Sequence, residues 1–83
     1  SQQVVEQMAK GVRMLMSTDI AVATSGIAGP AGGTEEKPVG TVWIAVSTQN
    51  QMISRKFQFG KNARENIIER STLAALMMVK ELL

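Results

Sequence analysis

Residues 24–40, TSGIAGPAGGTEEKPVG, divide this chain into two regular parts, because no helix or strand can run through them. They hold five of the seven glycines and both prolines of the 83 residues. Glycine and proline interrupt regular elements, so the helices and strands must lie before and after this loop. Loops longer than about 12 residues are usually functional or disordered. From the residues alone, an idle connector between two strands and a ligand-binding loop remain equally open.

One helix and one short strand are predicted before the loop. In residues 1–17 apolar side chains recur every three or four residues, which predicts an amphipathic helix with Ser1 as its N-cap. Gly11 lies inside this helix at a cost of about 1 kcal/mol relative to alanine, so we expect another element to approach closely there. Residues 20–24, IAVAT, are apolar and bounded by turn residues, which predicts a strand buried on both faces.

Two strands and a second helix are predicted after the loop. Residues 41–47, TVWIAVS, are rich in β-branched and aromatic side chains, which favours a central strand. A hairpin turn at 48–51 leads to residues 52–59, whose alternation of apolar and polar side chains predicts a half-exposed strand. Asn62 and Glu65 resemble a capping box and predict that the last helix begins there and runs to the C-terminal residue.

These five elements carry more apolar surface than they can bury among themselves. The segment 73–79, LAALMMV, is apolar nearly all round, and a helix without a polar face must be covered on more than one side. The methionines at 8, 14, 16, 77 and 78 are interpreted as core residues rather than as a cofactor site. We therefore expect that the chain either dimerises or forms part of a larger sheet domain.

The composition excludes several classes of function. The chain has no cysteine and no histidine, which excludes disulfides, thiol chemistry, zinc clusters and a Ser-His-Asp triad within it. Nine basic and seven acidic residues are spread along the chain, and three aromatic residues are too few for a base-stacking surface. No apolar run approaches the roughly 18 residues of a membrane span. We expect a cytoplasmic protein without metal, nucleic-acid or membrane partners.

If the loop binds a ligand, its glycines suit an anion. Glycines at 26, 29, 32 and 33 let backbone amides turn toward a phosphate or carboxylate. Their spacing, G-x-x-G-x-x-G-G, matches neither the dinucleotide fingerprint nor a P-loop. The residues around Ser25, ATSGI, do not form a G-x-S-x-G nucleophile elbow either. Neither standard nucleotide-binding class fits.

Three polar residues beside the loop have both a structural and a functional explanation. Ser25, at the end of a predicted strand, can cap the backbone or act in a site. Lys37 lies next to two glutamates, as in a surface charge cluster. Arg64 is predicted in the first turn of the last helix, where a cation opposes the helix dipole. A bound anion would explain an arginine in that place, and a solvated side chain is the alternative.

The string SGIAGPAGGTEEKPVGTVWIAV strongly resembles the signature of the CinA C-terminal domain family, T/S-G-I-A-G-P-x-G-G-T/S-x-x-K-P-V-G-T-V. The preceding helix, VVEQMAKG, agrees with the family, and Gly60 followed by Arg64 resembles its F-x-G-D segment and the arginine after it. Lys61-Asn62 replaces the commoner Gly-Asp, and Ala31 replaces a glycine or aspartate. The resemblance implies an α/β fold, a three-layer α/β/α domain with a mixed sheet. Residues 1–83 would be its C-terminal part, and its upstream half would be absent.

The resemblance also implies a chemistry, because the family includes nicotinamide-nucleotide amidases. These hydrolyse the carboxamide of nicotinamide mononucleotide to nicotinic acid mononucleotide and ammonia, without metal or cofactor. The family's nucleophilic serine, in A-E-S-x-T-G-G, and its lysine, in Y-S-N-x-x-K, have no counterpart in this chain. Ser25 takes the place of an active-site hydroxyl. The residues implied to bind substrate are Thr24, Gly26, Gly29, Gly32, Gly33, Lys37 and Arg64.

Two functions therefore remain in view. The chain is either part of an amidohydrolase, to which it contributes the glycine-rich pocket loop, or a non-catalytic CinA-like interaction or regulatory module. The expected partners are a small nucleotide substrate, the remainder of the same domain and further copies in a homo-oligomer.

Overall fold

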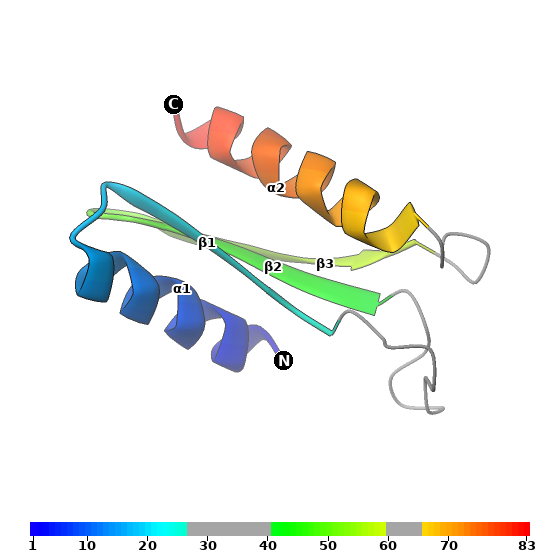
Figure 1. The fold of residues 1–83 in the computed structure, drawn as a ribbon, viewed down its shortest axis with the longest axis horizontal. Coiled ribbons are helices and arrows are strands. Elements are labelled where there is room, and N and C mark those ends of the chain that lie inside the picture. Colours follow the sequence, from blue (N-terminus) through cyan, green and yellow to red (C-terminus); the bar gives the residue numbers. More distant parts are fainter. Residues whose placement is uncertain (27–40, 60–65) are drawn as a thin grey trace.

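A computed structural model describes residues 1–26, 41–59 and 66–83, which form a sheet with one helix on each face. In chain order the elements are α1 (Gln2–Met16), β1 (Ile20–Ser25), β2 (Thr41–Thr48), β3 (Met52–Gln58) and α2 (Ile67–Leu82). Figure 1 shows the sheet between α1 and α2, so the three layers are helix, sheet and helix. The α/β architecture predicted from the sequence is confirmed.

The sheet has the strand order β1-β2-β3, and both described pairs are antiparallel. β2 is central, as predicted, and its side chains are buried over most of its length. The turn between β2 and β3 is held by Thr48, whose hydroxyl oxygen accepts hydrogen bonds from the backbone N–H groups of Asn50 and Gln51 at 3.3 and 2.9 Å. β1 is an edge strand of the described sheet, since its only described neighbour is β2.

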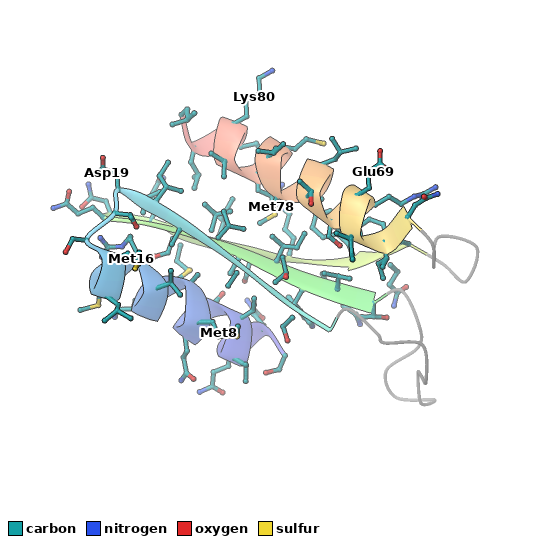
Figure 2. All side chains as sticks on the ribbon, in the orientation of Figure 1. Met8, Met16, Asp19, Glu69, Met78 and Lys80 are labelled. Carbon is teal, nitrogen blue, oxygen red and sulfur yellow. The ribbon has the colours of Figure 1, made fainter. Side chains whose placement is uncertain are left out.

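Each helix packs on the sheet through its own apolar cluster. α2 places Ala74 and Met78 against β2 residues Ile44 and Val46. Figure 2 shows Met78 turned toward the sheet and Lys80 turned away from it. α1 places Val5 and Ala9 against alanines of β1 and β2, whose small side chains let the helix approach the sheet closely. Full burial of one such aliphatic side chain contributes about 1.5–3 kcal/mol.

The helix ends follow local capping rules. The Ser1 hydroxyl accepts a hydrogen bond from the backbone N–H of Val4 at 3.3 Å, which confirms the predicted N-cap. Ser17 ends α1 in a left-handed conformation with φ of 54°. In the described residues α2 begins at Ile67 with Asn66 as its N-cap, and the predicted capping box of Asn62 and Glu65 lies outside the described residues.

Three packing expectations are wrong for the described part of the chain. β1 is covered on one face only: Ala21 and Ala23 are buried under α1, whereas Val22 on the other face is 39% exposed, because α2 packs on β2 and β3. Of the five methionines interpreted as core, only Met78 is buried. A Cβ added to Gly11 would meet no described atom within 4 Å, so no described element approaches the helix there.

Neither described helix is long and apolar enough to cross a membrane.

Candidate functional site

The candidate site is the end of β1, where Thr24, Ser25 and Gly26 leave the sheet. Ser25 lies opposite Trp43 in the β1–β2 ladder and Thr24 lies opposite Ile44. Both side chains are partly exposed, so each can reach a ligand as well as the protein. The tripeptide is therefore held in a fixed register by β2.

Gly26 is a position that only glycine can occupy without strain. Its φ is +95°, a conformation that L side chains rarely adopt. An ideal Cβ built on Gly26 would also lie 2.8 Å from the carbonyl oxygen of Thr41 and within 4 Å of two further backbone atoms of β2. The backbone of the loop entrance thus passes directly against the first residues of β2. The positive φ at Gly26 is a conformation that glycine permits.

Thr24 and Ser25 point to opposite faces of the sheet, because successive side chains on a strand alternate. Ser25 shares its face with Trp43, which packs beside the α1 cluster. Thr24 shares its face with α2 and lines a groove between β1 and that helix. A ligand that contacts both hydroxyls must therefore lie across the end of the strand rather than on one face.

A buried hydroxyl adjoins this end of the sheet. The Oγ1 of Thr41 is inaccessible to solvent and has no hydrogen-bond partner among the described residues. A buried polar atom without a hydrogen-bond partner usually costs about 1–3 kcal/mol. Thr41 belongs to the same loop entrance as Gly26, whose backbone it contacts.

The described residues do not supply a general base for Ser25. Ser25 lies opposite Trp43 of β2, and Trp43 lies opposite Lys56 of β3. Lys56 is the nearest cation in this row of the sheet, and its backbone is two strands, about 10 Å, from the backbone of Ser25. Among the described residues no group of three acidic side chains could hold a metal ion. The described part of the site therefore offers hydroxyls and backbone, and it does not itself contain an activated nucleophile.

Five of the predicted site residues lie outside the described residues, namely Gly29, Gly32, Gly33, Lys37 and Arg64. Thr24, Ser25 and Gly26 are the ones that the structure brings together.

Sequence reasoning missed the groove between β1 and α2. This groove has a volume of about 300 Å³, and its walls are formed by Val22 and Thr24 of β1 and by Ile68, Ser71, Thr72, Ala75, Leu76 and Val79 of α2. The apolar segment 73–79 signalled that α2 needs covering on more than one side. The position of the groove depends on the placement of α2 over β2 and β3, which no local pattern indicates.

Sequence reasoning also missed an ion pair between α2 and β3, on the side of α2 away from the groove. The guanidinium of Arg55 on β3 donates a hydrogen bond of 2.9 Å to the carboxylate of Glu81, and a second, shorter one to its other oxygen. The hydrogen bond from Arg55 holds the pKa of Glu81 below its ordinary value. The same hydrogen bond raises the pKa of Arg55. The pair ties the C-terminal turn of α2 to β3.

Comparison with known proteins places this chain in a family. The family model described as CinA C-terminal domain matches residues 1–83. A CinA-like protein of Shewanella pealeana is 50% identical over 76 residues, which are 92% of this chain and 18% of that protein. A CinA-like protein of Shewanella loihica is 51% identical over the same shares. The chain thus spans less than a fifth of the length of these relatives.

Solved structures contain the same fold. A competence/damage inducible protein of Agrobacterium tumefaciens is 37% identical and superposes with a TM-score of 0.92 over 99% of this chain and 50% of that one. A competence-damaged protein (CinA) superfamily protein of Escherichia coli is 30% identical, with a TM-score of 0.86 over 100% of this chain and 48% of that one. The sequence matches and the shared fold agree, and the chain belongs to the CinA C-terminal domain family.

Proposed function

We propose that the complete protein hydrolyses the carboxamide of nicotinamide mononucleotide, and that this chain contributes one wall of the substrate pocket. The family membership and the resemblance of residues 25–46 to the signature segment support this activity. The family's nucleophilic serine and lysine segments do not occur in this sequence. The chain is thus proposed as a necessary part of the enzyme and not as the whole of it.

The observation that carries the proposal is the backbone geometry at Gly26. A positive φ and a Cβ position only 2.8 Å from the Thr41 carbonyl oxygen describe a loop entrance that is built for close backbone approach. The contact positions the backbone where the glycine-rich segment leaves the sheet. Backbone that is free of side chains lets its amide groups reach a substrate directly, which is the usual purpose of glycine in such loops.

The reaction defines what such a wall can do. A serine oxygen from outside this chain would lose its proton and add to the carboxamide carbon, and the carbonyl oxygen becomes an oxyanion. The C–N bond then breaks as the nitrogen takes up a proton and leaves as ammonia, and the oxyanion returns to a carbonyl in an acyl-enzyme ester. Water hydrolyses this ester through a second oxyanion, which gives the carboxylic acid and restores the serine hydroxyl. Donors held at a fixed distance from the oxyanion stabilise this step, and loss of one donor costs about 100- to 1,000-fold in rate in a well-studied protease. Ser25 and the backbone beside Gly26 are the groups of the described chain that could orient the substrate.

The test is ammonia release from nicotinamide mononucleotide by the purified complete protein and two serine variants. Ser25→Ala should lower kcat/KM at least about tenfold with little change in melting temperature, because the hydroxyl is partly exposed. Ser54→Ala is the matched control. The Ser54 hydroxyl lies on the same face of the sheet as that of Ser25 but opposite a different residue of β2, and it donates a 2.5 Å hydrogen bond to Glu6. This control should keep its kcat/KM. The proposal fails if the parent protein releases no ammonia, and the role of Ser25 fails if both variants keep full activity.

A further inference from the structure

A row of three side chains crosses the sheet at the candidate site. Ser25, Trp43 and Lys56 lie opposite one another on β1, β2 and β3. Directly opposed residues of an antiparallel sheet project from the same face, so the three side chains are neighbours on one face. The row lies where β1 ends, and it has a hydroxyl at one end and a cation at the other.

Contacts with α1 identify the face on which this row lies. Trp43 is partly exposed and packs against the apolar cluster between α1 and the sheet. Ser54, two residues before Lys56 on β3, donates a hydrogen bond to Glu6 of α1. Side chains two residues apart on a strand share a face, so Lys56 also projects on the α1 side.

Lys56 is exposed, and no carboxylate among the described residues forms an ion pair with it. Glu6 projects toward the same face, but its carboxylate accepts hydrogen bonds from Gln2 and Ser54. A charge on an edge strand often serves only to keep other strands away. The neighbouring Arg55 already supplies such a charge to β3, which leaves Lys56 available to a ligand.

The length of the row suits a phosphorylated substrate. The separation of about 10 Å between the backbones of Ser25 and Lys56 is too long for a base and its nucleophile. In nicotinamide mononucleotide the pyridine ring and the ribose separate the carboxamide from the phosphate by roughly 8–10 Å at ordinary bond lengths. The ring carries a positive charge in this nucleotide, and tryptophan is the aromatic side chain that attracts a cation best. A substrate along the row would thus place its ring beside Trp43 and its phosphate beside Lys56.

We propose that Lys56 binds the 5′-phosphate of the substrate, so that the enzyme prefers the mononucleotide to its riboside. This inference rests on the proposed amidase function and adds to it a residue that selects the substrate. The carboxamide lies at Ser25, and the ammonium group of Lys56 donates hydrogen bonds to the phosphate oxygens. The first turn of α1 adjoins the row through the hydrogen bond from Gln2 to Ser54, and it contains no acidic side chain that would repel an anion.

The first test compares nicotinamide mononucleotide with nicotinamide riboside as substrates of the complete protein. Lys56→Met removes the charge and keeps most of the side-chain length. It should lower kcat/KM for the mononucleotide about tenfold or more at low salt, chiefly through a higher KM, and leave kcat/KM for the riboside unchanged. Lys80→Met is the matched control, because Lys80 is exposed on α2 and turned away from the sheet (Figure 2). An unchanged substrate preference in Lys56→Met, or equal losses with both substrates, would overturn the inference.

The second test uses the unsubstituted complete protein and needs no turnover. Acetic anhydride labels exposed lysines, and mass spectrometry measures the labelling rate at each position. The reaction product, nicotinic acid mononucleotide, at roughly ten times its Kd should slow the labelling of Lys56 about tenfold by mass action. Nicotinic acid riboside should leave the labelling of Lys56 unchanged, and Lys80 should react equally with either ligand present. Equal labelling of Lys56 with the mononucleotide and with the riboside would overturn the inference.

The proposed function and this inference fail in different ways. A parent protein that releases no ammonia from the mononucleotide overturns the proposed function, and this inference with it. An active parent in which Lys56 is neither protected by the mononucleotide nor needed for substrate preference overturns this inference alone.

Discussion

The backbone of Gly26 lies so close to the carbonyl of Thr41 that a Cβ on Gly26 would stand 2.8 Å from its oxygen. This contact joins the end of β1 to the beginning of β2 at the two ends of the glycine-rich segment. It fixes where that segment leaves the sheet, and it makes the glycine a requirement of the fold as well as of the proposed pocket.

Gly26→Ala should therefore destabilise the complete protein by about 1–3 kcal/mol, since both the positive φ and the short distance to backbone would have to change. Urea unfolding measures this cost. If activity is present, it should fall further than the loss of folded protein explains, because the pocket wall moves. An alanine variant with parental stability and activity would show that the contact is not needed.

Ser17→Gly makes the opposite change and serves as its counterpart. Ser17 has a φ of 54°, in the left-handed region where a side chain costs about 1–2 kcal/mol. Glycine at this exposed C-cap of α1 relieves the backbone strain but also increases the conformational entropy of the unfolded chain, which opposes the gain. The net effect should be a rise of up to about 1 kcal/mol in the free energy of unfolding. A loss of stability would mean that the Ser17 side chain makes contacts in the complete protein that outweigh its backbone strain.

Met78→Ala should be among the most destabilising truncations in α2. Met78 is fully buried against β2, so its removal leaves a cavity and should cost about 2–5 kcal/mol. Met77→Ala is the matched control, since the preceding side chain is 67% exposed and should cost less than about 0.5 kcal/mol. Chemical denaturation of the complete protein distinguishes them. Similar losses at the two positions would indicate that the outer face of α2 is also covered.

Arg64→Ala tests the proposed contact of this arginine with the substrate phosphate or carboxamide. Arg64 precedes the N-cap of α2 by two residues and lies outside the described residues. Loss of a hydrogen bond to a charged group costs about 1.5–3 kcal/mol, so kcat/KM of the complete enzyme should fall about 10- to 100-fold. Arg70→Ala, at an exposed position of α2, should change neither kcat/KM nor melting temperature. Unchanged kinetics in Arg64→Ala would defeat the assignment.

The Arg55–Glu81 pair should contribute to stability only above the acid range. The hydrogen bond from Arg55 lowers the pKa of Glu81 in the folded protein. The pair therefore stabilises the fold fully when the pH is above about 4.3, the pKa of a glutamate in the unfolded chain. This stabilisation is lost as the pH falls through the lower pKa that Glu81 has in the folded protein. Glu81→Gln should thus lower the melting temperature slightly at about pH 7 and not at about pH 2.5. Both groups are about half exposed, so high salt should reduce the difference. A pH-independent difference would contradict this role, and Glu69→Gln on the same helix provides the control.

The sequence alone determined the order of the elements, most of their boundaries and the family. Apolar periods of three to four residues placed α1, a short apolar run between turn residues placed β1, a β-branched and aromatic run placed β2, and alternation placed β3. Each of these signals depends on residues that are near neighbours in the chain. That glycine permits a positive φ at position 26 was clear from the sequence, whereas the close approach to Thr41 that makes it necessary is seen only in the structure.

Only the tertiary structure decided which of the apolar faces are covered. β1 was predicted to be buried on both faces, but α2 packs over β2 and β3 and leaves Val22 in an open groove. It also decided that Thr24 and Ser25 face different layers. Periodicity shows that a face is apolar, whereas the element that covers it is set by the crossing of helices and strands far apart in the chain.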